Sequence, residues 1–313
     1  MHSSGTSARP SFAYLPGAPG SPVILHVPHS SRVVPADVRR GITLDDAALA
    51  RELDHITDAH TEEIAAAAAA RCAVRPWRFV NRLSRLVTDP ERFPDEREEM
   101  LSVGMGAVYT RTTHGAPLRP AAYDSRPLVE RYFRPYAAAM TEAVAGRLAA
   151  VGRAVIIDVH SYPTERLPYE LHGDGPRPAI CLGSDGFHTS AELLGRAGRA
   201  FAECARSAES AASTASAASA ASTEPGDVPG TADGGGGGRG GRSGRGGGIG
   251  IDSPFRGTYV PLKYYGTDRR VAALMIEIRR DVYMSEPGGP ADASGVEALG
   301  EALARLVDAA GAL

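Results

Sequence analysis

The 313-residue sequence is poor in cysteine, has no apolar run of membrane-spanning length and carries no excess of charge of one sign. Its three cysteines, Cys72, Cys181 and Cys204, are odd in number, widely separated and without CxxC spacing. This pattern argues against a disulfide framework and against a thiolate zinc site. Residues 1–22 also lack the apolar core of a signal peptide. We therefore expect a cytoplasmic protein.

Composition and charge point to an ordinary globular domain. A net charge of -3 and a pI near 6.3 give no sign of a nucleic-acid or membrane partner, and 43% hydrophobic residues suffice for a large core. Residues from about 207 to 250 are nearly all alanine, serine and glycine, a composition that predicts a disordered insert. We expect a flexible lead over residues 1–21 and a single domain over 22–313, interrupted by that insert.

Short apolar runs alternate with helical patterns along the chain. Expected strands cover residues 23–27, the surroundings of 80 and 86–87, 154–159, 179–182 and 270–279. Expected helices cover 43–72, 124–151, 189–206 and the end of the chain from 294. Thr43 with Asp46, and Ser294 with Glu297, resemble capping boxes at two helix starts. The alternation predicts an α/β fold whose mixed, mostly parallel sheet lies between helices.

Polar residues stand at the ends of three predicted strands. His29 follows VILHV, His160 follows AVIID, and Glu277 lies inside LMIEI. A catalytic zinc takes three protein ligands from histidine and acidic residues and leaves a fourth position for water. His29 and His160 are the best candidate pair, because strand ends in such sheets gather at one site. Asp158, two residues before His160, is a candidate to orient its imidazole.

The acidic metal ligand is expected from the helical segment LDHITDAHTEEI. Asp54, Asp58 and Glu62 share one helical face there at i, i+4 spacing, and His55 and His60 compete with them as ligands. Spacing alone does not choose between Asp54 and Asp58. A solvated acidic face on a surface helix is the alternative interpretation.

Glu277 is the sharpest anomaly of the sequence. An ionised carboxylate inside an apolar strand is costly to bury unless it is paired, protonated or facing a polar cavity. A carboxylate beside a metal site can take a proton from attacking water and return it to a leaving amine, so Glu277 is the candidate general base. An internal salt bridge to Arg279 or Arg280 is the alternative.

Arginines supply candidate substrate contacts. The segment SRLVTDPERFPDERE places Arg85, Asp89 and Arg92 near a strand end, and guanidinium groups suit bidentate capture of a carboxylate. Arg279 is a further candidate, although most arginines are surface residues in weak pairs.

A second arginine pattern lies in the low-complexity insert. Arg239, Arg242 and Arg245 stand in GRGGRSGRGGG, which resembles an arginine-glycine RNA-binding segment. Because the segment has few arginines and the whole chain is slightly acidic, a neutral linker is the favoured interpretation.

Several motifs in order along the chain resemble the N-formylglutamate amidohydrolase family. They are VPHSS at 27–31, LDHITD, SRLVTDPERF, GAVYTRT at 106–112, DVHSYP at 158–163, and PFRGTYVP through MIEIRRDVYM. The resemblance runs from about residue 22 to residue 284, apart from the insert. This family is similar to zinc carboxypeptidases and aspartoacylase-like deacylases, which implies their mixed sheet between helices and a metal held by two histidines and one carboxylate.

The resemblance assigns roles to residues. It implies one zinc ion held by His29, Asp58 and His160, with Glu277 as general base. It further implies a substrate-carboxylate clamp formed by Arg85 and Arg92. Of the remaining candidates, Arg279 is taken as a further substrate contact, and Asp158, Asp54 and Asp89 as neighbours of the ligands. Carboxypeptidases carry the first histidine and the acid in an HxxE motif, whereas here the acid lies well downstream of His29.

The expected function is zinc-dependent hydrolysis of the amide bond of an N-acyl amino acid. N-formyl-L-glutamate, giving formate and L-glutamate in amino-acid degradation, is the first expectation. Another N-acyl amino acid or a peptide is the nearer alternative, and a non-catalytic scaffold with an RNA-binding loop is the alternative of another class. The expected partner is a small molecule that carries a carboxylate, with neither membrane nor nucleic acid. The sequence is silent on oligomeric state.

Overall fold

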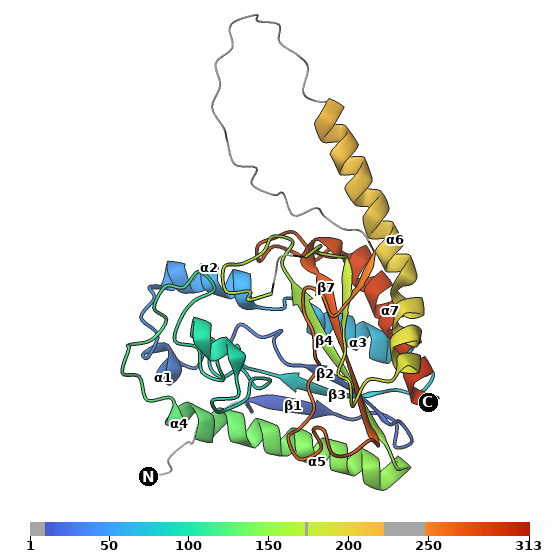
Figure 1. Ribbon diagram of the computed structural model, residues 1–313, viewed down its shortest axis with the longest axis horizontal. Coiled ribbons are helices and arrows are strands. Elements are labelled where there is room, and N and C mark those ends of the chain that lie inside the picture. Colours follow the sequence, from blue (N-terminus) through green and yellow to red (C-terminus); the bar gives the residue numbers. More distant parts are fainter. Residues whose placement is uncertain (1–9, 173–174, 222–247) are drawn as a thin grey trace, which may run out of the picture.

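A single sheet organises the protein. The computed structural model describes residues 10–172, 175–221 and 248–313. They form a seven-stranded sheet in the order β1-β3-β2-β4-β7-β5-β6, with helices on both faces (Figure 1). The strands are β1 (Phe12–Leu15), β2 (Val23–Val27), β3 (Trp77–Asn81), β4 (Ala154–Tyr162), β5 (Ile180–Gly183), β6 (Ile249–Ile251) and β7 (Val271–Arg279).

The sheet is mixed and mostly parallel, as predicted. Strands β3, β2, β4 and β7 run parallel to one another and β5 runs parallel to β6, whereas β1 and β5 lie antiparallel to β3 and β7. The central pair β4–β7 is matched over its full length, with His160 opposite Glu277. Its residues are almost all buried, because both faces of the sheet are covered.

Helices cover the sheet in two layers. Helices α3 (Thr61–Arg71), α6 (Ala191–Ala221) and α7 (Ala293–Gly311) lie on one face, and α5 (Arg134–Val151) lies on the other (Figure 1). The remaining helices are α1 (Ala36–Arg39), α2 (Asp46–Ile56), α4 (Arg126–Leu128) and the short turns η1 (Glu99–Val103), η2 (Val129–Phe133) and η3 (Arg280–Val282). None of the helices in this part of the chain is long and apolar enough to cross a membrane.

Small residues bring α3 and α7 close together over the sheet. A Cβ atom on Gly300 would meet the Cβ atom of Ala67 at 2.7 Å, so a larger residue there forces the helices apart. On its other side, α7 buries Leu299, Leu303 and Leu306 in the main core. The alanine-rich sequence of α3 therefore has a packing role beyond its helix propensity.

The predicted helix over residues 43–72 is wrong in one important respect, because it is two helices. α2 ends at Ile56 and α3 starts at Thr61, and His60 between them has a left-handed backbone with φ 63°. Asp58 lies in this break, where its backbone N–H donates to the carbonyl of His29 at 3.0 Å. The shared helical face of Asp54, Asp58 and Glu62 therefore does not exist.

Both predicted capping boxes are misplaced. Asp45 caps α2 by accepting from the N–H of Ala48, while the hydroxyl of Thr43 donates to the carbonyl of Pro117. Asp292 caps α7, which starts before Ser294. An aspartate close to each expected cap takes the role, since its carboxylate is a strong acceptor for free N–H groups.

Three other boundaries differ from the prediction. Residues 86–87 form no strand, and Phe12–Leu15 in the expected flexible lead form the edge strand β1. The first part of the expected disordered insert is helical, because α6 continues to Ala221 through alanine-rich sequence of high helix propensity. The arginine-glycine segment lies outside the described residues.

Candidate metal centre

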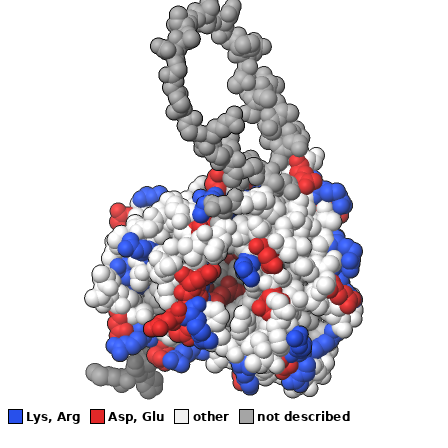
Figure 2. Space-filling view, viewed as in Figure 1, with Lys and Arg blue, Asp and Glu red and all other residues white. Residues whose placement is uncertain are grey.

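A cavity of about 650 Å³ opens where β2, β4 and β7 end. Its wall includes His29 beyond β2, His160 near the end of β4 and Glu277 near the end of β7. Figure 2 shows a hollow in this face of the molecule with acidic and basic side chains gathered in and around it. The strand ends that the sequence predicted to gather at one place thus line one cavity.

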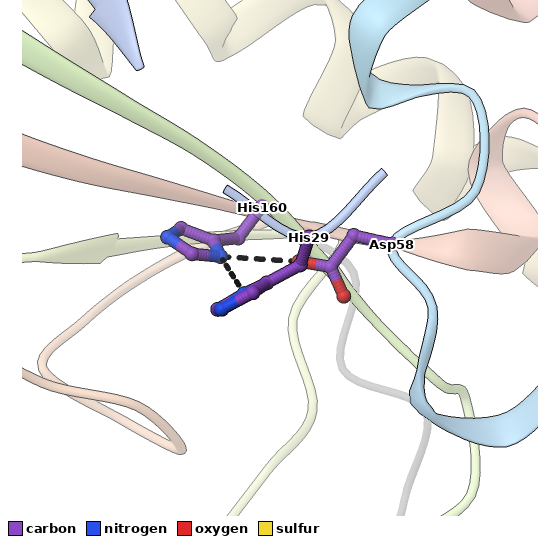
Figure 3. A group of neighbouring side chains, drawn as sticks. All are labelled: His29, Asp58 and His160. Atoms are coloured by element: carbon purple, nitrogen blue, oxygen red, sulfur yellow. Dashed lines mark hydrogen bonds and ion pairs between the residues drawn. The ribbon is translucent and has the colours of Figure 1, made fainter. Parts of the chain in front are cut away.

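His29, Asp58 and His160 meet at the floor of this cavity. Their side chains point toward one another from three separate segments (Figure 3). His160 Nδ1 lies 3.0 Å from Asp58 Oδ2 and 3.3 Å from His29 Nδ1, and His29 Nδ1 lies 3.7 Å from Asp58 Oδ2. All three residues are at most 3% exposed. They form a group able to hold a metal ion.

These separations fit a tetrahedral cation. Zinc bonds of about 2.0 Å at tetrahedral angles place neighbouring donor atoms roughly 3.3 Å apart. The three observed separations of 3.0, 3.3 and 3.7 Å bracket that value. Two imidazole nitrogens and one carboxylate oxygen are also the donor set of many catalytic zinc sites. The residues present therefore fit a zinc ion.

The outer nitrogen of each imidazole faces a carboxylate. His29 Nε2 lies 2.9 Å from Asp89 Oδ1, and His160 Nε2 lies 3.2 Å from Asp158 Oδ1 and 3.3 Å from Glu91 Oε2. Since a carboxylate only accepts, neutral His29 carries its proton on Nε2, toward Asp89, and keeps Nδ1 as a lone-pair donor. His160 Nε2 lies within ion-pair distance of Asp158 and Glu91 but makes no hydrogen bond among the described residues. Asp89 and Asp158 thus lie where sequence reasoning expected neighbours of the ligands. Glu91 was missed, although its place two residues after Asp89 was a signal.

The site favours positive charge in the metal-free chain. Burial lowers the pKa of His160, but Glu91 and Asp158 raise it more, so the net pKa is well above its usual value. The pKa of His29 is likewise raised, since Asp89 and Glu91 outweigh burial and Arg85. Burial raises the pKa of Asp58, but hydrogen bonds to His160 and His29 lower it overall. A divalent cation supplies the same positive charge and releases these protons on binding.

Glu277 lies beside this group. Burial, with the nearby charge of Asp58, raises its pKa to about 8. Its Oε2 atom is buried and has no hydrogen-bond partner among the described residues. Because Glu277 is the cross-strand neighbour of His160, its side chain lies on the same face of the sheet as the His160 ring. A buried, unpartnered acid in a cavity is typical of a functional group rather than a structural one.

Arg85 and Arg92 both line the cavity, but they differ in their freedom to bind substrate. Arg85 Nη2 donates to Asp89 Oδ2 at 2.7 Å, and its Nε donates to the Tyr109 hydroxyl at 2.9 Å. Arg92 makes longer ion pairs of 3.5 Å to Asp89 and Glu98. Arg92 is therefore the better placed of the two to bind a carboxylate.

Arg279 and Asp54 lie away from the cavity. Arg279 Nε donates to Asp281 at 2.7 Å, which holds its side chain among residues between α6 and α7. Asp54 pairs with Arg32 at 2.7 Å and does not line the cavity. The neighbouring Arg280 lines the cavity instead, with Nη2 3.4 Å from Asp58 Oδ1. The chain turns at the end of β7, so strand alternation did not predict which arginine faces the site.

The competing histidines also lie apart from the metal group. His55 packs against His114 with ring centroids 5.0 Å apart and the rings tilted by 57°, and His60 pairs with Glu63 at 3.1 Å. Of the acidic candidates on this segment, the geometry thus brings only Asp58 to His29 and His160.

Comparison with known proteins identifies the family of the chain. The chain matches the sequence model of N-formylglutamate amidohydrolases over residues 21–284. It belongs to that family. Family membership makes the protein an amidohydrolase, and the predicted resemblance is confirmed.

Solved structures share the fold of this family member. N-formylglutamate amidohydrolase from Ralstonia eutropha JMP134 has a TM-score of 0.69 and 21% identity, over 96% of this chain and 97% of that chain. A gene product of Agrobacterium tumefaciens has a TM-score of 0.59 and 16% identity, over 95% and 93%. No curated protein matches the chain. At these identities the likeness shows a common α/β fold.

Proposed function

We propose that this amidohydrolase uses one zinc ion, held by His29, Asp58 and His160, to hydrolyse the amide bond of an N-acyl amino acid. N-formyl-L-glutamate, giving formate and L-glutamate, is the first candidate substrate. The observation that carries the proposal is the meeting of two imidazole nitrogens and one carboxylate oxygen, 3.0 to 3.7 Å apart, beside a buried acid. The cytoplasm stays the predicted compartment.

Glu277 is the proposed general base. A bound zinc ion would polarise the acyl carbonyl and lower the pKa of water in the site. The positive charge would also lower the pKa of Glu277, so that its carboxylate is ionised at neutral pH. Glu277 then takes a proton from the water that attacks the acyl carbon and delivers it to the departing amine nitrogen. Its Oε2, which has no hydrogen-bond partner in the described part of the chain, is available for both transfers.

Arg92 is the proposed contact for the substrate's carboxylate, and Arg280, whose Nε and Nη1 already donate to Ser161 Oγ and to the His55 carbonyl, adds positive charge to the wall. Both line the cavity together with Arg85, whose Nε and Nη2 are already bonded to Asp89. Arg85 therefore fixes Asp89 and contributes its charge, while Arg92 binds the substrate directly. Arginines on the wall favour an acidic amino acid over a neutral one.

The decisive experiment is an acyl-substrate screen of metal-stripped protein with and without added zinc. Formyl, acetyl and longer acyl derivatives of glutamate, aspartate, glutamine and leucine are incubated with the protein, and the released amine is measured. We expect zinc-restored hydrolysis, fastest with formylglutamate, and a loss of at least about 100-fold in Glu277→Gln.

Glu142→Gln is the matched control, because this exposed residue of α5 lies outside the cavity. We expect it to hydrolyse the substrates at the wild-type rate. Stoichiometric zinc with no hydrolysis of any substrate would contradict the enzymatic proposal, as would hydrolysis that persists in Glu277→Gln. A higher rate on another acyl amino acid would keep the chemistry and change the substrate.

A further inference from the structure

A chain of buried polar side chains leads from helix α5 to His160. The Tyr136 hydroxyl lies 2.6 Å from His26 Nε2, and His26 Nδ1 lies 2.7 Å from Asp158 Oδ1. The same Asp158 oxygen lies 3.2 Å from His160 Nε2, an ion-pair separation at which this ring nitrogen makes no hydrogen bond in the described part of the chain. Each of the four residues is at most 3% exposed. No role in the proposed hydrolysis has so far been given to Tyr136 or His26.

The hydrogen bonds of this chain have a defined direction. The Asp158 carboxylate only accepts, so His26 donates to it from Nδ1–H. The Nε2 atom of neutral His26 then accepts from the Tyr136 O–H, which fixes the tautomer. His26 and Asp158 are also opposite residues of the parallel strands β2 and β4. Both the sheet register and the hydrogen bonds therefore hold Asp158 in place.

Glu91 is the competing partner for His160. Its Oε2 lies 3.3 Å from His160 Nε2, but its Oε1 is buried with no hydrogen-bond partner in the described part of the chain. Asp158 is held at both oxygens, because Oδ2 accepts from the backbone N–H of Tyr259 at 3.2 Å. Glu91 also lies 3.5 Å from His26 Nδ1 and 3.7 Å from His29 Nε2, so Asp158 is the one of the two carboxylates that hydrogen bonds hold at both oxygens.

We propose that Tyr136 and His26 are positioning residues that act through Asp158 to fix the ring of His160 for metal binding. The inference rests on the proposed metal site and adds to it two residues on separate elements, one on β2 and one on α5. Metal affinity then depends on side chains that do not touch the metal.

Zinc affinity of the full chain tests the proposal directly. Metal-stripped wild type, Tyr136→Phe and Tyr132→Phe are titrated with zinc against a fluorescent chelator, so the readout is independent of activity. Tyr132 is the matched control, a buried tyrosine in η2, directly before α5, whose hydroxyl has no partner among the described residues. We expect Tyr136→Phe to weaken zinc binding about 3- to 10-fold and Tyr132→Phe to leave it unchanged.

Two substitutions of His26 separate positioning from packing. His26→Asn keeps an N–H close to the Nδ1 position, whereas His26→Phe keeps a ring against Tyr259, whose centroid lies 4.7 Å away, and loses the donor. We expect His26→Phe to weaken zinc binding about 10- to 100-fold and His26→Asn to weaken it less, even where its melting temperature is lower.

The possible outcomes are distinct. Wild-type zinc affinity in both Tyr136→Phe and His26→Phe would overturn the inference and leave the proposed function standing. Affinity that follows melting temperature across all the variants would assign the two residues a structural role, which also overturns it. A wild-type protein that binds no zinc would overturn the metal-based function and this inference together.

Discussion

Replacing Glu277 by glutamine is expected to stabilise the metal-free protein while abolishing its hydrolysis. The carboxyl group has a pKa of about 8 in the folded chain against a model value of 4.5, chiefly because it is buried. Between these two values the unfolded state has lost the proton that the folded state retains, so folding stability falls as pH rises. Above pH 8 the carboxyl group is ionised in both the folded and the unfolded state, so the loss of folding stability no longer changes with pH. Glutamine has nearly the same shape and no such titration.

The size of this effect follows from the difference between the pKa values of Glu277 in the folded and unfolded states. Each pKa unit of difference corresponds to about 1.4 kcal/mol, so the wild type should lose about 2 kcal/mol relative to Glu277→Gln between pH 5 and pH 7. For a domain of this size that is a shift of several degrees in melting temperature. Zinc should reduce the difference, because a cation beside the carboxylate favours its ionised form.

Urea unfolding of metal-stripped wild type and Glu277→Gln at pH 5, 6, 7 and 8 measures this difference. Glu142→Gln, on the exposed side of α5, is the control and should follow the wild type at every pH. A stability difference that stays constant with pH, or a glutamine variant less stable than the wild type throughout, would refute the assignment of a destabilised buried acid. Such a result would remove the main physical argument for Glu277 as general base.

Three further outcomes are expected. Arg92→Lys should raise KM at least about 10-fold for formylglutamate with little change in kcat, because the lost contact is to a carboxylate. The rise in KM should be smaller for an acyl amino acid amide. Zinc affinity should fall as pH falls through neutrality, since the raised pKa values of His29 and His160 make protons compete with the metal; a pH-independent affinity would contradict the ligand assignment. Deletion of residues 222–247 should leave hydrolysis unchanged, because no proposed site residue lies there; a loss of RNA binding with unaltered hydrolysis would instead reveal a separate role for that segment.

The sheet was predictable because its strands are continuous apolar runs. AVIID and LMIEI can be read as buried strands, and the structure pairs them over nine residues with His160 opposite Glu277. Side chains alternate along a strand, so Asp158 and His160 share a face, as the sequence predicted. Sequence reasoning therefore located the parts of the site that lie on strands.

The parts held by turns were harder to predict. Asp58 was singled out by resemblance, because helical spacing placed Asp54 and Asp58 on equal terms. The choice depends on the break between α2 and α3, where His60 adopts a left-handed conformation that no glycine or proline marks. Arg280 was missed for a similar reason, since the strand ends at Arg279 and the chain turns there. As a result, Arg280 lines the cavity and Arg279 does not. Local periodicity carries no information about such turns.

His26 shows a third limit of sequence reasoning. It lies inside VILHV, where a histidine has neither a neighbouring acid in sequence nor a loop around it. Its partners, Tyr136 and Asp158, are 110 and 132 residues away and reach it only through the sheet register and the packing of α5. A fully buried histidine in a strand requires partners for both ring nitrogens, so their existence could be inferred while their identity could not.

The three proposed ligands are held in place by different contacts, and these contacts decide which ligand is most easily displaced. His160 lies in a strand paired on both sides, and His29 follows directly from one. Asp58 lies in a turn, held by its N–H bond to the His29 carbonyl and by Arg280 near its outer oxygen. Because Arg280 also lines the substrate cavity, a substrate carboxylate that binds it competes with Asp58 for the same guanidinium. Substrate binding would therefore be coupled to the geometry of the acidic ligand, whereas the backbone of His160 is held by the sheet.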